Sequence, residues 1–124
     1  VPGHNDFHAI CVHLGLRASH RQKQLELLCE LVDSLPGDAP VVVAGDFNDW
    51  RLKAANTLNR CAGMHEVFAL SHGQVAKTFP ARWPMLRLDR IYVRNATSHK
   101  PQILGNKPWT HLSDHLPLAV EIRL

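Results

Sequence analysis

Residues 41–50 read VVVAGDFNDW, an apolar run that passes directly into glycine, aspartate, phenylalanine and asparagine. An unbroken run of branched apolar residues is typical of a strand buried on both faces. The run begins at Ala39, so we expect a strand over 39–47 whose tip carries Asp46 and Asn48. A rigid strand holds such polar side chains in place where a ligand can reach them. The stretch therefore predicts a central strand of an α/β sheet with a candidate site at its end.

The residues before this stretch predict a strand and a helix. FHAICVHL at 7–14 is rich in branched apolar residues, which is typical of a strand. Ser19 and Gln22 form an S-x-x-Q capping box, so we expect a helix to begin there and to end at Pro36 and Gly37. Apolar residues at helical spacing support this helix, namely Leu25, Leu28, Leu31, Val32 and Leu35.

The residues after the stretch predict a second helix and further strands. Apolar residues recur every third position over 51–62, which indicates a helix that ends at Gly63. The rest divides into a short strand at 67–70, a loop at 71–87, a strand at 88–94, a loop at 95–110 and a strand at 117–124. The resulting β-α-β-α-β-β-β order has no internal repeat or linker, and it predicts one mixed α/β unit.

The composition is that of an ordinary globular domain. The chain has 124 residues, 45% hydrophobic and 20% charged, and its net charge of +3 is compatible with a phosphate-bearing substrate. No apolar run approaches the ~20 residues that cross a bilayer, and no secretory leader is visible, so we expect no membrane span and a cytoplasmic protein. Cys11, Cys29 and Cys61 are odd in number and lack CxxC spacing, which predicts reduced thiols.

Polar side chains gather at the ends of the predicted strands. They are His13 after the first strand, Asp46 and Asn48 after the second, Asp89 at the start of the strand at 88–94, and Asp114 and His115 before the last strand. Each has a structural interpretation of its own, as a turn, a helix cap, a strand edge or a hydrogen-bonded core histidine. Those separate interpretations do not explain why all of these residues occur in one short chain.

Hydrolysis of a phosphate ester needs this combination of side chains. Carboxylates hold a hard cation such as Mg²⁺ that neutralises phosphoryl oxygens, and a carboxylate or histidine activates the attacking water. An amide orients that water without adding charge, and imidazoles donate hydrogen bonds to the developing oxyanion. Three aspartates, one asparagine and two histidines are therefore a suitable set for metal-dependent hydrolysis of a phosphate ester.

The sequence resembles the endonuclease/exonuclease/phosphatase superfamily in its motifs and in their order. The motifs are VHLGL at 12–16, GDFN at 45–48, TFP at 78–80, LDRIYV at 88–93 and SDHLPL at 113–118. The resemblance implies a DNase I-like α/β sandwich, of which this chain contributes a mixed sheet with two main helices. It also implies an enzyme of the nuclease or phosphodiesterase type.

The resemblance assigns a role to each candidate residue. His13 and His115 contact the scissile phosphate, Asp46 orients or activates the attacking water, Asn48 holds that water and the phosphate, Asp89 pairs with His115, and Asp114 binds metal. The implied cofactor is Mg²⁺ or Mn²⁺, held by Asp114, Asp46 and Asn48. An Asp–His hydrogen bond fixes the tautomer of the imidazole and raises its basicity, which agrees with the assigned pair.

The front of the family's domain has no counterpart in this sequence. That half supplies an asparagine and a glutamate, the principal metal ligand, whereas Glu26, Glu30 and Glu66 all follow the first predicted strand. We therefore expect residues 1–124 to be the C-terminal part of a single domain whose N-terminal half is absent. We expect the fragment to be inactive or nearly so, and to self-associate through the exposed sheet face.

Other functions and several substrates stay open at this point. A non-catalytic module on the same fold would bind nucleic acid or a protein, and a transition-metal site would use the H-x₃-H spacing of His4 and His8. The motifs do not choose among DNA, RNA, a lipid head group and a small phosphoester. Residues that could contact phosphate or stack on a base are Arg82, Trp83, Arg87 and Arg90, and Trp50 and Trp109 could form a pocket wall; the alternatives are a solvated basic loop and core tryptophans.

Overall fold

The computed structural model describes residues 6–49 and 53–124 of the chain. In chain order the elements are β1 (His8–His13), α1 (Ala18–Asp33), β2 (Val41–Asp46), α2 (Lys53–Ala62), β3 (His65–Glu66), α3 (Val67–His72), β4 (Asp89–Arg94), β5 (Thr97–Ile103), α4 (Trp109–Leu112) and β6 (Leu118–Arg123). The predicted strands at both ends and in the centre of the chain, and both main helices, are confirmed.

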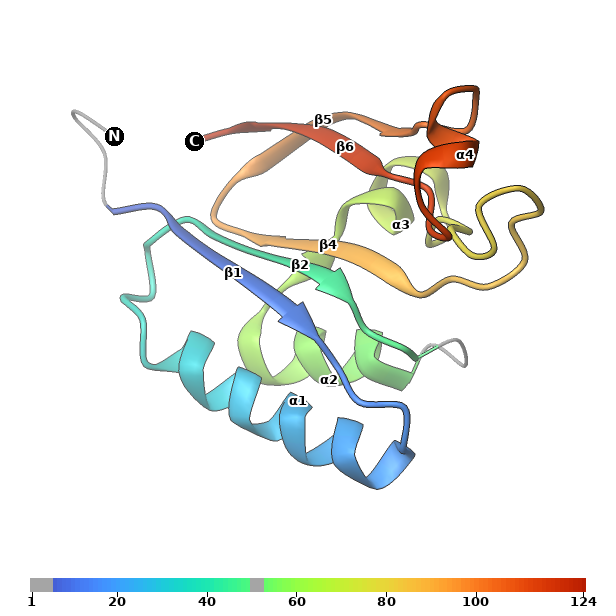
Figure 1. Cartoon of the computed structure of the whole chain (residues 1–124). Coiled ribbons are helices and arrows are strands. Elements are labelled where there is room, and N and C mark those ends of the chain that lie inside the picture. Colours follow the sequence, from blue (N-terminus) through green and yellow to red (C-terminus); the bar gives the residue numbers. More distant parts are fainter. Residues whose placement is uncertain (1–5, 50–52) are drawn as a thin grey trace.

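The strands form two sheets that lie in separate layers (Figure 1). The larger sheet has the order β1-β2-β4-β3, with β1 parallel to β2, and β4 antiparallel to its neighbours. The helices α1 and α2 cover one face of this sheet, and the antiparallel β5–β6 ribbon lies over the other face together with α3. This arrangement confirms a mixed α/β sandwich with two main helices.

Apolar side chains of β2 point to both faces of the larger sheet, because side chains alternate along a strand. Val41 and Val43 are fully buried against α1 and α2, in a cluster with Val32, Leu58 and Phe47. The other face has its own cluster, formed by Val67, Phe68, Ala76 and Val93 with the partly buried Val42, Ile91, Leu118, Val120 and Ile122. Burial on both faces fixes the direction of β2, so the position of the GDFN turn is fixed as well.

Three local predictions are wrong, and each has a physical reason. The helix α1 begins at Ala18 after Arg17, without a side-chain cap, so Ser19 is not its N-cap. Residues 67–70 belong to the helix α3, because the Glu66 carboxylate accepts hydrogen bonds from the Phe68 and Ala69 backbone N–H groups at its start. Residues 97–103 form a strand inside the predicted loop, with a bulge between His99 and Gln102.

The expectation of reduced thiols is wrong for Cys29, which is disulfide-bonded, whereas Cys11 is a free, exposed thiol. Disulfides persist in oxidising compartments and are rare in the cytosol. No helix in the described part of the chain has the length and apolar character that a membrane crossing requires.

The strand β1 exposes part of one face of the larger sheet, and this face is where the predicted self-association would occur. Residues alternate along β1 between half-buried and exposed, and the exposed ones include Ala9 and Cys11. At millimolar protein concentration we expect a dimer in sedimentation velocity, and Ala9→Lys should return the protein to a monomer because it places a charge on this face. A wild-type protein that stays monomeric at that concentration contradicts the prediction. The control is Lys23→Gln at an exposed position of α1, which should leave the dimer unchanged.

Candidate active site

Three predicted site residues lie side by side across three neighbouring strands. His13 at the end of β1 is in register with Asp46 at the end of β2, and Asp46 is in register with Asp89 at the start of β4. Residues in register on adjacent strands project from the same face of a sheet. The row therefore follows from strand pairing, and it places two carboxylates directly opposite each other.

The GDFN turn is held by its glycine and its asparagine. Gly45 has φ +146, and a Cβ built there would lie 1.9 Å from the Val12 carbonyl oxygen, so only glycine allows β1 and β2 to approach this closely. Asn48 has φ +47, and its backbone N–H donates to Asp46 Oδ1 at 2.9 Å. Its side-chain Nδ2 donates to the Leu14 carbonyl at 2.6 Å. These bonds fix the Asp46 carboxylate beside the end of β1.

His115 closes the site from the loop before β6. Its Nδ1 hydrogen-bonds Asp89 Oδ2 at 2.6 Å, so the predicted pair is present. The same Asp89 oxygen accepts a hydrogen bond from Thr78 Oγ1 at 2.6 Å, and Thr78 is fully buried. The Phe79 ring packs against the imidazole with ring centroids 5.0 Å apart. Sequence reasoning noted the threonine of TFP without a role, and the structure places it behind the Asp–His pair.

Both imidazoles converge on the Asp46 carboxylate. Asp46 Oδ2 lies 3.7 Å from His13 Nε2 and 3.9 Å from His115 Nε2. The side chain of His13 is 78% exposed and that of His115 is 27% exposed, so the group is open to solvent on the His13 side. A cavity of about 360 Å³ adjoins it, lined in part by Asp89, Ser113 and His115. The arrangement offers two donors and a carboxylate base around one open position.

The acidic surroundings of His115 change its pKa. Partial burial alone would lower the pKa, but the hydrogen bond and charge of Asp89, together with the charges of Asp46 and Asp114, outweigh burial and raise the pKa above the ordinary 6.5. The surroundings therefore stabilise the protonated imidazole relative to that of an ordinary histidine.

The raised pKa predicts a pH dependence of stability in the metal-free protein. The folded state holds the His115 proton more tightly than the unfolded state does, so this contribution is complete below the unfolded pKa and is lost as the pH rises through the folded pKa. We expect Asp89→Asn to lower the pKa of His115 and to flatten this dependence, whereas Asp33→Asn on remote α1 should change neither. Urea unfolding from about pH 5 to about pH 9 and the NMR titration of His115 measure both effects. An unchanged titration in Asp89→Asn contradicts the assignment.

One cluster in the described residues has donors close enough to hold a metal ion. Asp46, Asp89 and His115 each offer one ligand atom, and these atoms lie within 4.8 Å of one another. Two carboxylate oxygens suit Mg²⁺ or Mn²⁺, and the imidazole nitrogen suits Mn²⁺ better than Mg²⁺. A cation would also offset the repulsion between the two opposed carboxylates. The donor set therefore fits a divalent cation, with few protein ligands.

Two of the predicted metal ligands lie beside this cluster. Asp114 is exposed, and its backbone carbonyl accepts a hydrogen bond from the Ala81 N–H at 2.8 Å. The amide nitrogen of Asn48 is bonded to Leu14, which leaves only its side-chain oxygen for a ligand. Neither residue belongs to the cluster of three, so their metal-binding role stays a prediction.

The structure separates the residues that sequence reasoning proposed for substrate. Arg90 is fully buried and forms an ion pair with Asp49, 3.3 Å from Nη1 to Oδ2, so neither alternative left open for it, a phosphate contact or a solvated basic loop, is correct. Arg82 and Trp83 are exposed, and Arg82 lines a cavity of about 280 Å³ with Ser113 and Asp114.

The structure describes one of the two tryptophans proposed as a pocket wall and one of the two histidines of the H-x₃-H alternative. Trp109 is 39% exposed at the start of α4, while Trp50 lies outside the described residues. His4 also lies outside them, so the H-x₃-H alternative has only His8 in the described part of the chain.

Comparison with known families and proteins identifies relatives of this chain. The sequence model described as "Endonuclease/Exonuclease/phosphatase family" matches residues 2–115. A protein of Escherichia coli K12 named "Uncharacterized protein YbhP" is 56% identical over 117 residues, 94% of this chain and 46% of that protein. The "UPF0294 protein YE0917" of Yersinia enterocolitica is 34% identical over 122 residues, 95% of this chain and 41% of that protein. The chain thus spans less than half the length of these relatives.

Solved structures share the arrangement of helices and strands. The crystal structure of D. rerio TDP2 complexed with a single strand DNA product superposes with a TM-score of 0.76 at 22% identity, over 94% of this chain and 56% of that chain. An endonuclease/exonuclease/phosphatase from Bacteroides vulgatus superposes with a TM-score of 0.69 at 26% identity, over 86% of this chain and 44% of that one. The shared fold is DNase I-like.

Proposed function

Because the chain belongs to the endonuclease/exonuclease/phosphatase family, we propose that it carries the C-terminal part of the active site of a metal-dependent phosphoester hydrolase of the nuclease or phosphodiesterase type. The observation that carries the proposal is the row of His13, Asp46 and Asp89 across three strands, closed by His115. Since the chain spans less than half of its relatives, the activity proposed is that of the longer protein, and the fragment alone is expected to be inactive or nearly so.

The side chains divide the work of in-line phosphoester hydrolysis. Asp46 accepts a proton from the attacking water, which the Asn48 side-chain oxygen helps to orient. His13 and His115 donate hydrogen bonds from their Nε2 atoms to phosphoryl oxygens as negative charge develops. Asp89 accepts the Nδ1–H of His115, so His115 donates from Nε2 in its protonated form, which the neighbouring carboxylates stabilise. Thr78 in turn orients Asp89.

A bound Mg²⁺ or Mn²⁺ would supply neutralisation of phosphoryl charge in this site. Asp46 and Asp89 would hold it, and Asp114 and Asn48 are the further ligands that we predict. The expected affinity of the fragment is weak, because few protein oxygens converge on one point.

Removal of divalent metal tests the proposal directly. We expect the longer protein to hydrolyse bis(4-nitrophenyl) phosphate with Mg²⁺ or Mn²⁺, to lose this activity in excess EDTA, and to regain it when either metal is restored. Release of 4-nitrophenolate measures the rate. Hydrolysis that continues at the same rate in EDTA would contradict a metal-dependent mechanism.

A non-catalytic binding module on the same fold is the alternative. It would bind nucleic acid or a protein without turnover, and replacement of Asp46 would then leave its affinity unchanged. The paired Asp89 and His115 and the buried Thr78 behind them favour the hydrolase, because a binding surface does not require an imidazole held in one tautomer.

Nucleic acid is one substrate class that the surroundings favour. The similar D. rerio TDP2 structure is of a complex with a single strand DNA product. In this chain the exposed Arg82 and Trp83 follow the TFP motif, where they could contact phosphate and stack on a base. DNA, RNA, a lipid head group and a small phosphoester all remain within the proposed class.

Cellular location was predicted to be cytoplasmic, and the disulfide at Cys29 opposes this prediction. Structural disulfides are typical of oxidising compartments. The proposed activity does not depend on the compartment.

A further inference from the structure

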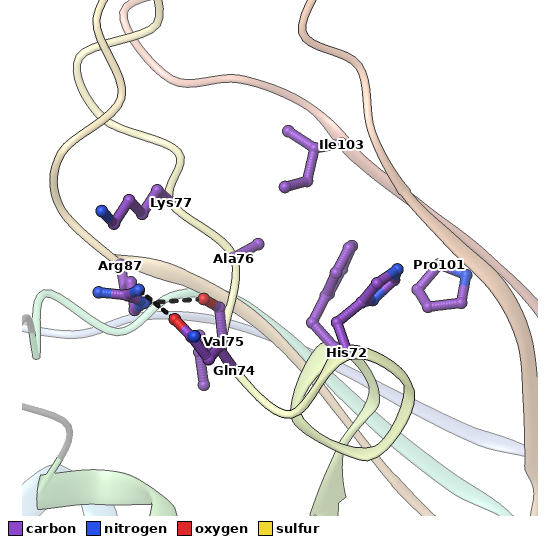
Figure 2. Close-up of a pocket in the computed structure, with 9 residues that line it drawn as sticks. His72, Gln74, Val75, Ala76, Lys77, Arg87, Pro101 and Ile103 are labelled. Atoms are coloured by element: carbon purple, nitrogen blue, oxygen red, sulfur yellow. Dashed lines mark hydrogen bonds between the residues drawn. The ribbon is translucent and has the colours of Figure 1, made fainter.

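A second cavity of about 450 Å³ lies outside the candidate active site. It is formed by α3, the segment that follows it, Arg87 and β5, and it shares no lining residue with the cavity beside His115. Figure 2 shows Lys77 and Arg87 on one side of it and His72, Pro101 and Ile103 on the other. A cavity of roughly 300 to 1,000 Å³ is large enough for a small molecule.

Most of the wall away from the cations is apolar. Phe68 is buried, and its ring stacks on that of His72 with centroids 5.8 Å apart and planes 22° apart. Pro101 is buried on β5, while Ile103 is 43% exposed at the opening. This wall can take up an aliphatic or aromatic group.

The guanidinium of Arg87 is held in one orientation with part of it left open. Its Nε donates to the Val75 carbonyl at 2.9 Å, and its Nη2 donates to Gln74 Oε1 at 2.7 Å (Figure 2). Both acceptors are neutral. The edge formed by Nη1 and the second hydrogen of Nη2 makes no hydrogen bond to any described residue. Two parallel N–H groups on a fixed plane match the two oxygens of a carboxylate.

The positive charges beside the cavity are not neutralised by described parts of the chain. Neither Lys77 nor Arg87 forms an ion pair with a described carboxylate, although Arg87 is half-buried. A half-buried cation without a counter-charge costs desolvation energy that a bound anion would offset. An apolar wall opposite two cations fits a ligand that has one charged end and one apolar end.

We propose that this cavity binds a small-molecule carboxylate with an apolar body. The carboxylate accepts from the open edge of Arg87 with Lys77 beside it, and the apolar body lies against His72, Pro101 and Ile103. A single negative charge suits the site better than a phosphate dianion, which is costlier to dehydrate against apolar walls. The site is separate from the phosphoester site, and it does not depend on the function proposed there.

Titration with 4-phenylbutyrate, followed by the backbone amide signals of the protein in NMR, tests the proposal. We expect saturable shifts in residues 68–77 and 101–103, and binding about tenfold weaker for the neutral 4-phenylbutanol, because it lacks the charge that Arg87 recognises. Inorganic phosphate should bind more weakly than 4-phenylbutyrate. Equal affinity of the acid and the alcohol, equal or tighter binding of phosphate, or shifts confined to residues around His115, would each overturn the proposal.

Matched variants locate the charge that matters. Arg87→Gln should weaken 4-phenylbutyrate about tenfold, and the exposed Lys77→Gln should weaken it several-fold without affecting folding. Lys23→Gln, an exposed cation on α1, should leave the affinity unchanged. Arg87 also donates hydrogen bonds to Gln74 and Val75, so the affinity of Arg87→Gln is interpreted only if its unfolding midpoint equals that of the wild type. An unaltered affinity in Lys77→Gln and in folded Arg87→Gln would refute a carboxylate site.

Discussion

Asp46→Asn should reduce phosphoester turnover by roughly 10²–10⁴-fold, the usual contribution of a positioned general base. Asparagine keeps an oxygen for the Asn48 N–H bond at the turn, but it cannot accept the proton of the attacking water. It relieves the repulsion between Asp46 and Asp89 but also removes the charge that faces His13 and His115, so the metal-free protein should keep about the stability of the wild type. The measurement compares kcat of the longer protein with its unfolding midpoint.

Matched variants keep this result interpretable. Asp33→Asn makes the same chemical change on the exposed end of α1 and should alter neither property. His115→Gln should also lower kcat, because it removes a donor to the developing negative charge. If Asp46→Asn retains full activity with either metal, Asp46 is not the base, and the mechanism proposed for the row of strand-end residues is wrong.

Asp49→Ala should cost about 3–5 kcal/mol of unfolding free energy, which is the effect of breaking a buried ion pair from one side. Arg90 is fully buried, and the Asp49 side chain that pairs with it is 4% exposed. Arg90 also donates to the backbone carbonyls of Asp49 and Arg87, and its guanidinium lies over the Phe47 ring, 5.7 Å from the centroid. Without the Asp49 carboxylate, the hydrogen bonds of this buried charge would go to neutral backbone carbonyls, and the Glu66 carboxylate would still interact with it.

Urea unfolding at constant m-value measures the loss. The double variant Asp49→Ala with Arg90→Met should recover part of it, because an apolar side chain of similar length removes the uncompensated charge. An exposed pair serves as the control: Glu121→Gln, which breaks the contact with Arg123, should cost about 1 kcal/mol or less. A loss as small as this in Asp49→Ala would mean that water reaches Arg90.

The sequence pattern within an element was sufficient to predict those strands and helices whose own apolar and turn residues determine their conformation. The unbroken apolar run at Val41–Asp46 predicted a strand covered on both faces, and clusters on both sides of the larger sheet confirm it. The spacing of leucines predicted α1, and the position of Gly63, with φ +62, predicted the end of α2. The family motifs predicted which residues would gather, because they mark the ends of those same elements.

Local pattern failed where a partner distant in the sequence decides the structure. Residues 67–70 are apolar enough for a strand, but Glu66 caps them as a helix and also accepts from the Ile91 N–H of β4. The strand β5 is polar, contains Pro101 and has a bulge, so its strand state depends on pairing with β6.

By itself the sequence determined the class of fold, the two main helices, the central strands and the residue types of the site, because hydrophobic periodicity and turn residues act within a few positions. Only the tertiary structure decided that His13, Asp46 and Asp89 share one register, that Thr78 supports the Asp89–His115 pair, and that Arg90 is a buried partner of Asp49. The paired residues in these arrangements lie 11 to 43 positions apart in the sequence. Strand pairing and burial, which no local pattern encodes, bring them together.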